Sequence, residues 1–182
     1  MTSDGAQTPE GSVAEQAQQA KTVCLRLLAQ RPYSRAELAE RLARKGFADD
    51  VASRVLDRLA GAKLVDDAAF AELLVRSRHT YGGRGRMALA NELRRKGVGT
   101  QDAEQALAGL SADDERGRAA ELVRAKLNGV VVPTDSAERD KLIRRLVGML
   151  ARRGYGSGLA FGVVKAELAA VGAGSDGLGE LD

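Results

Sequence analysis

Basic side chains gather between residues 76 and 98, and they are the strongest chemical signal in the chain. Seven lysines and arginines occur there against one acidic residue, Glu92. An arginine guanidinium presents its N–H donors as a planar fork that fits a phosphate or a carboxylate. The segment therefore predicts a surface that binds a polyanion or an acidic protein.

A second basic group occupies the predicted helix 137–153. Leu142, Leu146 and Leu150 mark its apolar face, and basic residues form another face. A functional basic groove and a solvated helix face both fit this pattern, and we favour the groove. Nine residues are the candidates for contact with a partner or DNA: Arg78, Arg84, Arg86, Arg94, Arg95, Lys96, Arg144, Arg145 and Arg152.

The sequence offers no pattern for catalysis or for metal or nucleotide binding. Residues Gly83–Ala88 (GRGRMA) match the GxGxxA dinucleotide pattern, but that motif needs a preceding strand, and a helix is predicted there. We expect instead a flexible elbow that exposes Arg84 and Arg86. The single histidine, His79, is expected at the surface of a helix end. We therefore predict a protein that is not an enzyme and takes no metal and no cofactor.

Charge is unevenly distributed along the 182 residues. The formal net charge is +3, yet residues 1–20 and 172–182 contain six acidic residues and no basic ones. The rest of the chain holds all 28 basic residues and 19 of the 25 acidic ones. A basic body between acidic ends favours a polyanionic partner or an acidic protein surface.

Two further features bear on the compartment. The N-terminal residues lack the basic and apolar regions of a signal peptide, and no apolar run approaches the roughly 20 residues that span a bilayer. Cys24, the single cysteine, lies among aliphatic residues, which predicts a buried thiol. We expect a cytoplasmic protein that does not associate with membranes.

One short pattern occurs three times, as Leu42–Phe47 (LARKGF), Leu93–Val98 (LRRKGV) and Leu150–Tyr155 (LARRGY). The glycine is expected to end a helix in the left-handed conformation, and the apolar residue after it should pack back against that helix. A period near 50 residues with helix–Gly–helix content indicates a helical repeat array.

Each repeat is expected to contain three helices, with Ser34, Ser111 and Asp135 as helix caps. The helices are predicted at 14–29, 35–45 and 50–61, at 67–80, 86–96 and 101–108, and at 112–127, 137–153 and 159–171. The repeats lie at 14–62, 63–110 and 111–172, between a disordered N-terminal tail at 1–13 and a disordered acidic C-terminal tail at 173–182. The fold class is all-α, an elongated tandem array of three three-helix repeats.

Together these residues resemble the RecX family of bacterial recombination regulators over roughly residues 23–171. The resemblance is most specific in the second repeat, at Val65, Asp66, Asp67, Phe70, Ala71, Val75, Arg78, Gly82, Glu92, Leu93, Lys96, Gly97 and Val98. The first repeat contributes Ser34, Glu37, Leu38, Leu42 and Lys45–Phe47, and the third mainly Leu150 and Arg153–Tyr155.

The resemblance implies a non-enzymatic protein that binds the RecA recombinase filament on single-stranded DNA. It implies inhibition of strand exchange, of ATP hydrolysis and of the co-protease activity in the SOS response to DNA damage. Single-stranded and double-stranded DNA are further candidate partners, and we expect a monomer.

Three other readings of the basic residues stay open. One is a plain scaffold that binds some other acidic partner. A stand-alone single-stranded DNA-binding module could compete for the strand. The helix pair 35–45 and 50–61 also fits a helix–turn–helix, but it offers only Ser53, Arg54 and Arg58 to base edges, so we do not favour it.

An elongated helical monomer is the first testable prediction, because the units of a repeat array contact only their neighbours. The circular dichroism spectrum should be helical, and small-angle scattering should give a radius of gyration above the roughly 16 Å of a compact chain of this length. A strand-dominated spectrum or a compact radius would contradict the prediction.

Overall fold

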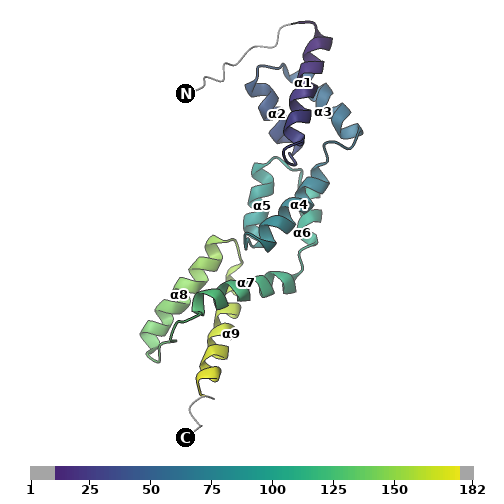
Figure 1. Ribbon diagram of the computed structural model, residues 1–182. Coiled ribbons are helices and arrows are strands. Elements are labelled where there is room, and N and C mark those ends of the chain that lie inside the picture. Colours follow the sequence, from purple (N-terminus) through teal and green to yellow (C-terminus); the bar gives the residue numbers. More distant parts are fainter. Residues whose placement is uncertain (1–10, 177–182) are drawn as a thin grey trace, which may run out of the picture. The chain divides into compact units, whose positions relative to one another are not determined.

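The computed structural model describes residues 11–176, and all regular secondary structure in that range is α-helical (Figure 1). The first three helices are α1 (Val13–Leu28), α2 (Arg35–Arg44) and α3 (Asp49–Gly61). The next are α4 (Asp67–Thr80), α5 (Arg86–Arg95) and α6 (Thr100–Ala108). The last are α7 (Ala112–Leu127), α8 (Ser136–Arg152) and α9 (Ser157–Asp176).

The predicted all-α repeat fold is confirmed, and the helix bounds agree closely with the sequence analysis except at the C-terminal end of α9. That helix continues to Asp176, and α1 begins at Val13, so both reach into the segments predicted as tails. The rest of the predicted tails, 1–10 and 177–182, lies outside the described residues. None of the described helices is both long and apolar enough to cross a membrane.

The predicted helix caps are present at all three positions. The Ser34 hydroxyl accepts a hydrogen bond from the Glu37 backbone N–H at 3.1 Å, and the Ser111 hydroxyl accepts one from Asp114 at 3.0 Å. The Asp135 carboxylate accepts one from the Glu138 N–H at 2.9 Å. Each cap satisfies a backbone donor in the first turn that has no partner within its helix.

The glycine of each repeated motif ends a helix as predicted. Gly46, Gly97 and Gly154 have φ angles of 82°, 68° and 88°. The N–H of the next residue then donates to the carbonyl five residues earlier, at 3.2 Å from Phe47, 3.1 Å from Val98 and 3.1 Å from Tyr155. These three apolar residues are buried, so the motif closes the helix and returns the chain to the core.

The chain divides into two compact units, and each has its own hydrophobic core. Unit 1 comprises residues up to 73 and 93–105, and its core joins α1, α2 and α3 around Leu38, Leu42 and Leu56. Unit 2 comprises 74–92 and the residues from 106 on. The division therefore passes through the helices of the middle repeat.

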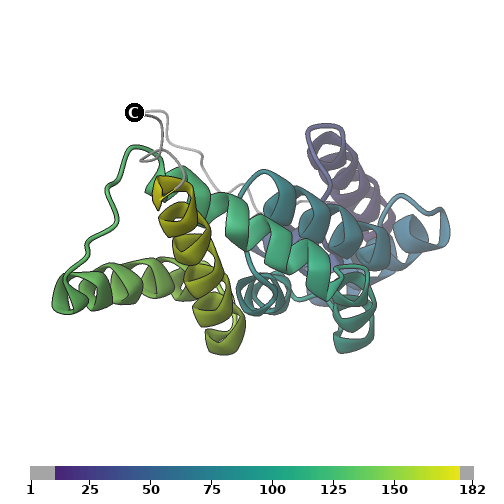
Figure 2. The same ribbon diagram turned by 90° about the horizontal axis from the view of Figure 1, so that it is seen from below.

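The core of unit 2 joins the three helices of the third repeat. Leu146 and Leu150 of α8 and Val164 of α9 are buried in it, with Val123 of α7. Figure 2 shows the linker between α7 and α8 as a long open loop, whereas α9 packs against both helices.

The buried thiol predicted for Cys24 is confirmed in the core of unit 1, where the side chain is fully buried. Burial disfavours the thiolate and raises the pKa of Cys24 to about 11. The thiol is therefore a small apolar core group rather than a nucleophile.

In unit 1, the C-terminal end of α5 lies against the N-terminal end of α2. The Ser34 hydroxyl donates to the Lys96 carbonyl at 2.6 Å, and the Arg35 N–H donates to the Asp67 carboxylate at 2.8 Å. The backbones are so close that a Cβ on Gly97 would lie 2.3 Å from the Cβ of Ala36.

In unit 2, the C-terminal end of α8 lies against the N-terminal end of α5 in the same way. The Gly85 N–H donates to the Arg153 carbonyl at 2.9 Å, and the Arg86 N–H donates to the Glu115 carboxylate at 2.8 Å. A Cβ on Gly154 would lie 2.3 Å from the backbone nitrogen of Ala88. We call this arrangement the repeat junction, and each unit contains one.

Replacing Gly97 by Ala should destabilise unit 1 for two separate reasons. The left-handed conformation costs a residue with a side chain about 1–2 kcal/mol, and the new Cβ would also overlap Ala36. Gly129→Ala is the matched control, because Gly129 has a φ of 72° but a Cβ there would meet nothing within 4 Å. In urea denaturation, Gly97→Ala should cost clearly more than Gly129→Ala.

The clash itself is tested by the second change Ala36→Gly, which removes the overlapping Cβ. The double variant Gly97→Ala with Ala36→Gly should lose less stability than the sum of the two single changes. Equal losses for Gly97→Ala and Gly129→Ala, or full additivity, would show that the junction is not tightly packed at this point.

Candidate functional site

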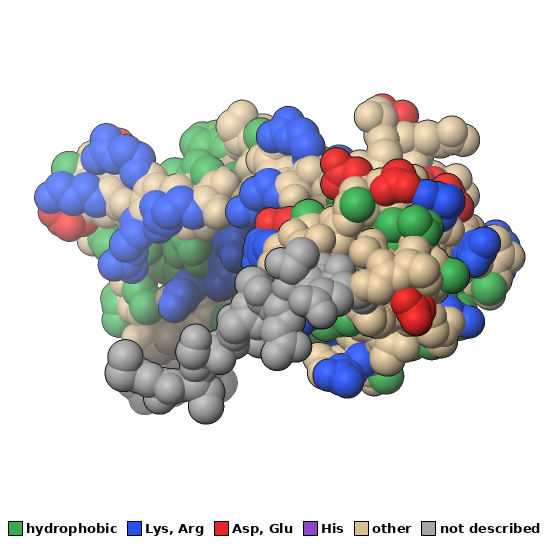
Figure 3. All heavy atoms as spheres, turned by 90° about the horizontal axis from the view of Figure 1, so that it is seen from above, with side chains coloured by type: hydrophobic (Ala, Val, Ile, Leu, Met, Phe, Trp, Pro, Cys, Tyr) green, Lys and Arg blue, Asp and Glu red, His purple; other side chains and the backbone are tan. Residues whose placement is uncertain are grey.

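The basic residues of α8 form one exposed group within unit 2. Arg144, Arg145 and Arg152 are exposed, whereas Leu146 and Leu150 of the same helix are buried. Residues 144 and 152 are two turns apart, roughly 12 Å along the axis. In Figure 3 a group of Lys and Arg side chains gathers on the left of the view, the side on which α8 lies in Figure 1.

The α8 arginines have no acidic partner among the described residues, as the recorded ion pairs of that helix join only Lys141 to Glu138. Their guanidinium groups are therefore available for an external carboxylate or phosphate. The helix fixes their spacing, so an anionic surface could contact several of them at once.

Arg84, Arg94 and Arg95 are also exposed. Arg84 lies in the loop between α4 and α5 and belongs to unit 2, whereas Arg94 and Arg95 lie at the end of α5 and belong to unit 1. The structure thus keeps seven of the nine candidates exposed to solvent, in two separate units, and one of the seven, Arg78, forms an ion pair with Glu92.

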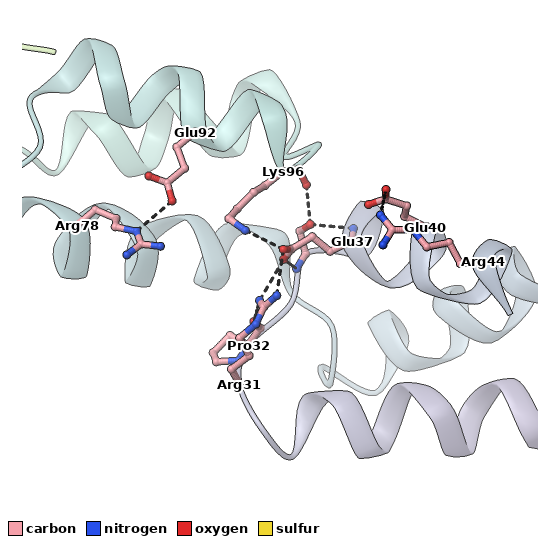
Figure 4. Close-up of polar contacts among 9 residues, drawn as sticks. Arg31, Pro32, Glu37, Glu40, Arg44, Arg78, Glu92 and Lys96 are labelled. Atoms are coloured by element: carbon pink, nitrogen blue, oxygen red, sulfur yellow. Dashed lines mark hydrogen bonds and ion pairs between the residues drawn. The ribbon is translucent and has the colours of Figure 1, made fainter. Parts of the chain in front are cut away.

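Lys96, by contrast, forms part of the repeat junction of unit 1 (Figure 4). Its ammonium lies 2.7 Å from a Glu37 carboxylate oxygen and 6.0 Å from the centre of the Phe70 ring. Arg31 donates to the same carboxylate at 3.2 and 3.3 Å, and the Ser34 N–H donates to it at 3.2 Å. Glu37 therefore joins the second helix of one repeat to that of the next.

This network determines the protonation of Glu37. Partial burial opposes ionisation and acts to raise the pKa, but the hydrogen bonds from Arg31, Lys96 and Ser34 outweigh it and lower the pKa of Glu37 to about 2. Lys96 is thus committed to a carboxylate within the fold.

The Arg86 side chain forms hydrogen bonds and an ion pair within unit 2. Its guanidinium donates to the Leu107 carbonyl at 2.8 Å and to the Leu110 carbonyl, at and just after the C-terminal end of α6. Its Nε lies 3.7 Å from Glu115, the carboxylate that also accepts the Arg86 N–H. The expectation of a freely exposed Arg86 is corrected, because its donors satisfy carbonyls that α6 leaves without internal partners.

We expected a flexible elbow at Gly83–Gly85, but hydrogen bonds hold this loop in place. The Gly83 N–H donates to the His79 carbonyl at 3.0 Å, and the Arg84 N–H donates to the Arg78 carbonyl at 3.1 Å. The Arg153 side chain adds a bond to the Gly82 carbonyl at 2.9 Å. These bonds hold the loop against the C-terminal end of α8.

His79 is buried, and the prediction of a surface histidine is wrong. Its Nδ1 lies 2.9 Å from the Arg84 carbonyl, which can only accept, so Nδ1 carries the proton. The histidine supports the loop from within. Nearby, Arg78 pairs with Glu92 at 3.0 Å, so its charge is also partnered within unit 2.

The sequence analysis missed Glu115, which is buried and holds the junction of unit 2. A signal was present, because residue 115 precedes Ala119, Val123 and Leu127 at intervals of four, on the buried face of α7. A carboxylate on an apolar helix face needs a partner, and here that partner is Arg86.

Glu37→Gln should lower the free energy of unfolding by about 2 kcal/mol at pH 7, because it removes a charge held by two cations. The pKa of Glu37 is depressed, so the ionised group stabilises the fold above pH 4.5 and this stabilisation is lost as the pH falls toward 2. The difference between variant and parent should shrink over that range in urea denaturation series.

Glu40→Gln is the matched control, since Glu40 lies on the same helix but its side chain is 62% exposed in a pair with Arg44. Its effect should stay below about 0.5 kcal/mol at every pH. A Glu37 variant that behaves like the Glu40 variant would remove Glu37 from the junction.

Comparisons with known proteins agree with this architecture. Residues 20–59 match the model of the first three-helix domain of RecX, and residues 66–107 match that of the second. Each range lies inside one predicted repeat. The fold is similar to a crystal structure of RecX from Lactobacillus salivarius, with a TM-score of 0.75 at 18% identity over 85% of this chain and 97% of that one.

Sequence relatives are considerably closer. Regulatory protein RecX of Mycolicibacterium vanbaalenii is 51% identical over 170 residues, which cover 92% of this chain and 91% of that protein. The Mycobacterium tuberculosis protein of the same name is 50% identical over 162 residues, which cover 89% of this chain and 93% of that protein. The chain therefore belongs to the RecX family of regulatory proteins.

Proposed function

We propose that this chain is a non-enzymatic negative regulator of the RecA recombinase. It binds the RecA filament on single-stranded DNA and inhibits the recombinase, ATPase and co-protease activities of the filament. Family membership supports the regulatory role, and the exposed arginines of α8 are the single observation that carries the mode of binding.

The α8 group fits a polyanionic or acidic partner because its charges have no acidic partner among residues 11–176 and are held on one helix. Each exposed ion pair contributes only about 0–1 kcal/mol, so one arginine would bind nothing firmly. Three arginines that engage together on a repeating surface, such as a filament, add their contributions without further loss of rotational freedom.

Arg84 and Arg95 extend the proposed binding surface within their own units, and Arg94 belongs with them as an exposed candidate. Arg78, Arg86 and Lys96 are left out, because their charged groups already hold carboxylates or carbonyls of the chain. We expect substitutions at these three positions to act through stability.

The triple change Arg144→Ala, Arg145→Ala and Arg152→Ala should weaken inhibition of RecA ATP hydrolysis on single-stranded DNA by at least about tenfold, the equivalent of 1.4 kcal/mol. Circular dichroism and the melting temperature should stay those of the parent, since these side chains are exposed and unpaired. Unchanged inhibition would place the binding surface elsewhere.

The matched control replaces three exposed basic residues of the first repeat, Lys21, Arg26 and Arg58, by Ala. It removes the same charge from helices outside the proposed surface, and inhibition should persist. If the control loses as much inhibition as the α8 variant, net charge rather than the α8 surface is responsible.

The same titration, repeated with excess free single-stranded DNA, distinguishes binding to the filament from direct competition for DNA. A filament-directed regulator should inhibit at fewer copies than are needed to coat the strand, and free DNA should reduce its effect little. A stand-alone DNA-binding module would need coating amounts and would fail steeply with salt.

A further inference from the structure

The two repeat junctions have the same arrangement, in which the end of one second helix packs on the start of another. The end of the first repeat's second helix and the start of the third repeat's second helix take part in neither junction. In unit 1, Lys96-Gly97 of α5 packs on Ala36 and Glu37 at the start of α2. In unit 2, Gly154 after α8 packs on Ala88 in the first turn of α5. On one side of the junction, a basic residue and a Gly follow the C-terminal end of a helix. On the other side, an Ala lies in the first turn of a helix.

The end of α2 carries the basic residue and the Gly without a partner. Lys45 and Gly46 occupy the positions of Lys96 and Gly97 in the repeated motif, and Gly46 has the same left-handed φ. Lys45 is exposed, whereas Lys96 is half-buried in its junction, and the two glycines are both exposed. No described residue is recorded as donating to the Lys45 carbonyl, although Ser34 donates to its counterpart on Lys96.

The start of α8 carries the other side of the junction. Asp135-Ser136-Ala137-Glu138 has the same register as Ser34-Arg35-Ala36-Glu37, because Asp135 and Ser34 are both N-caps. Ala137 and Glu138 thus match the Ala and Glu that receive Gly97 and Lys96. Glu138 is exposed and pairs with Lys141 of its own helix, whereas Glu37 is partly buried in its junction.

A hollow beside the start of α8 is open to an incoming chain. It has a volume of about 340 Å³, and its lining combines Val130, Val131, Pro133 and Leu142 with Glu138, Lys141 and Arg145. Val131 is 89% exposed at this hollow.

We propose that these two ends bind each other between copies of the chain. The end of α2 in one copy docks on the start of α8 in the next, with Gly46 against Ala137 and Lys45 against Glu138. The docked positions are opposite in charge, since Lys45 would meet Glu138 with Asp135 one turn before it, and Glu138 would exchange its ion pair with Lys141 for one with Lys45.

The joint is head-to-tail, so it uses different surfaces on the two copies and can repeat without closing. It is weaker than the internal junctions, because Asp135 lacks the donor hydroxyl by which Ser34 binds the Lys96 carbonyl. The area is also small, so the chain is a monomer when dilute and associates only when concentrated, as on a crowded filament.

Sedimentation velocity of the full chain tests the proposal. The weight-average sedimentation coefficient should rise with concentration up to about 1 mM, the range in which weak interfaces are populated. Lys45→Glu and Ala137→Trp should each abolish the rise, the first by charge repulsion and the second by filling the place of Gly46. Lys165→Glu makes the same charge change at an exposed site on α9 and should leave the rise unchanged.

Mixing experiments test the head-to-tail geometry. The Lys45→Glu variant keeps an intact docking surface at the start of α8, and the Ala137→Trp variant keeps an intact end of α2. In an equal mixture, the two intact surfaces should bind each other and form dimers that grow no further. The double change Lys45→Glu with Glu138→Lys should restore the rise that Lys45→Glu removes. A parent chain that stays monomeric at 1 mM, or single variants that associate as the parent does, would overturn the proposal.

Discussion

The ends of the second helices are the points on which this fold depends. A helix leaves backbone N–H groups unsatisfied at its start and carbonyls at its end. At the starts of α2 and α5, the first of these N–H groups is bound by a carboxylate of the following repeat, Asp67 or Glu115. The Lys96 and Arg153 carbonyls are bound in return by the preceding repeat. A single repeat therefore cannot satisfy its own second helix.

This constraint separates the basic residues into two classes that composition alone does not distinguish. Arg86 and Lys96 hold the junctions, and their charges are held by Glu115 and Glu37. The arginines of α8 project from the face opposite the core and hold nothing within the described part of the chain. A regulatory protein can thus use one residue type both as a structural connector and as a candidate contact for its partner.

Local features were predictable from the sequence, and long-range pairings were not. Gly97 and Gly154 follow basic residues at the ends of amphipathic helices, so their caps could be predicted from neighbours a few residues away. The pairing of Arg86 with Glu115 joins residues 29 apart, and Glu37 with Lys96 joins residues 59 apart. Periodicity contains no information about which helix end meets which. The burial of His79 was also missed, although its hydrogen-bond partner Arg84 is only five residues away.

The free energy of unfolding of Arg86→Met, compared with that of Arg144→Met, tests the central claim most directly. Both variants lose one guanidinium and keep an unbranched stem. Arg86→Met should lose about 2 kcal/mol, because it leaves two carbonyls without their donor and removes the cation beside the buried Glu115 carboxylate, which keeps only the backbone N–H of residue 86. Arg144→Met should change stability by less than about 0.5 kcal/mol. Equal losses for the two variants would contradict the division of the arginines into junction and surface residues.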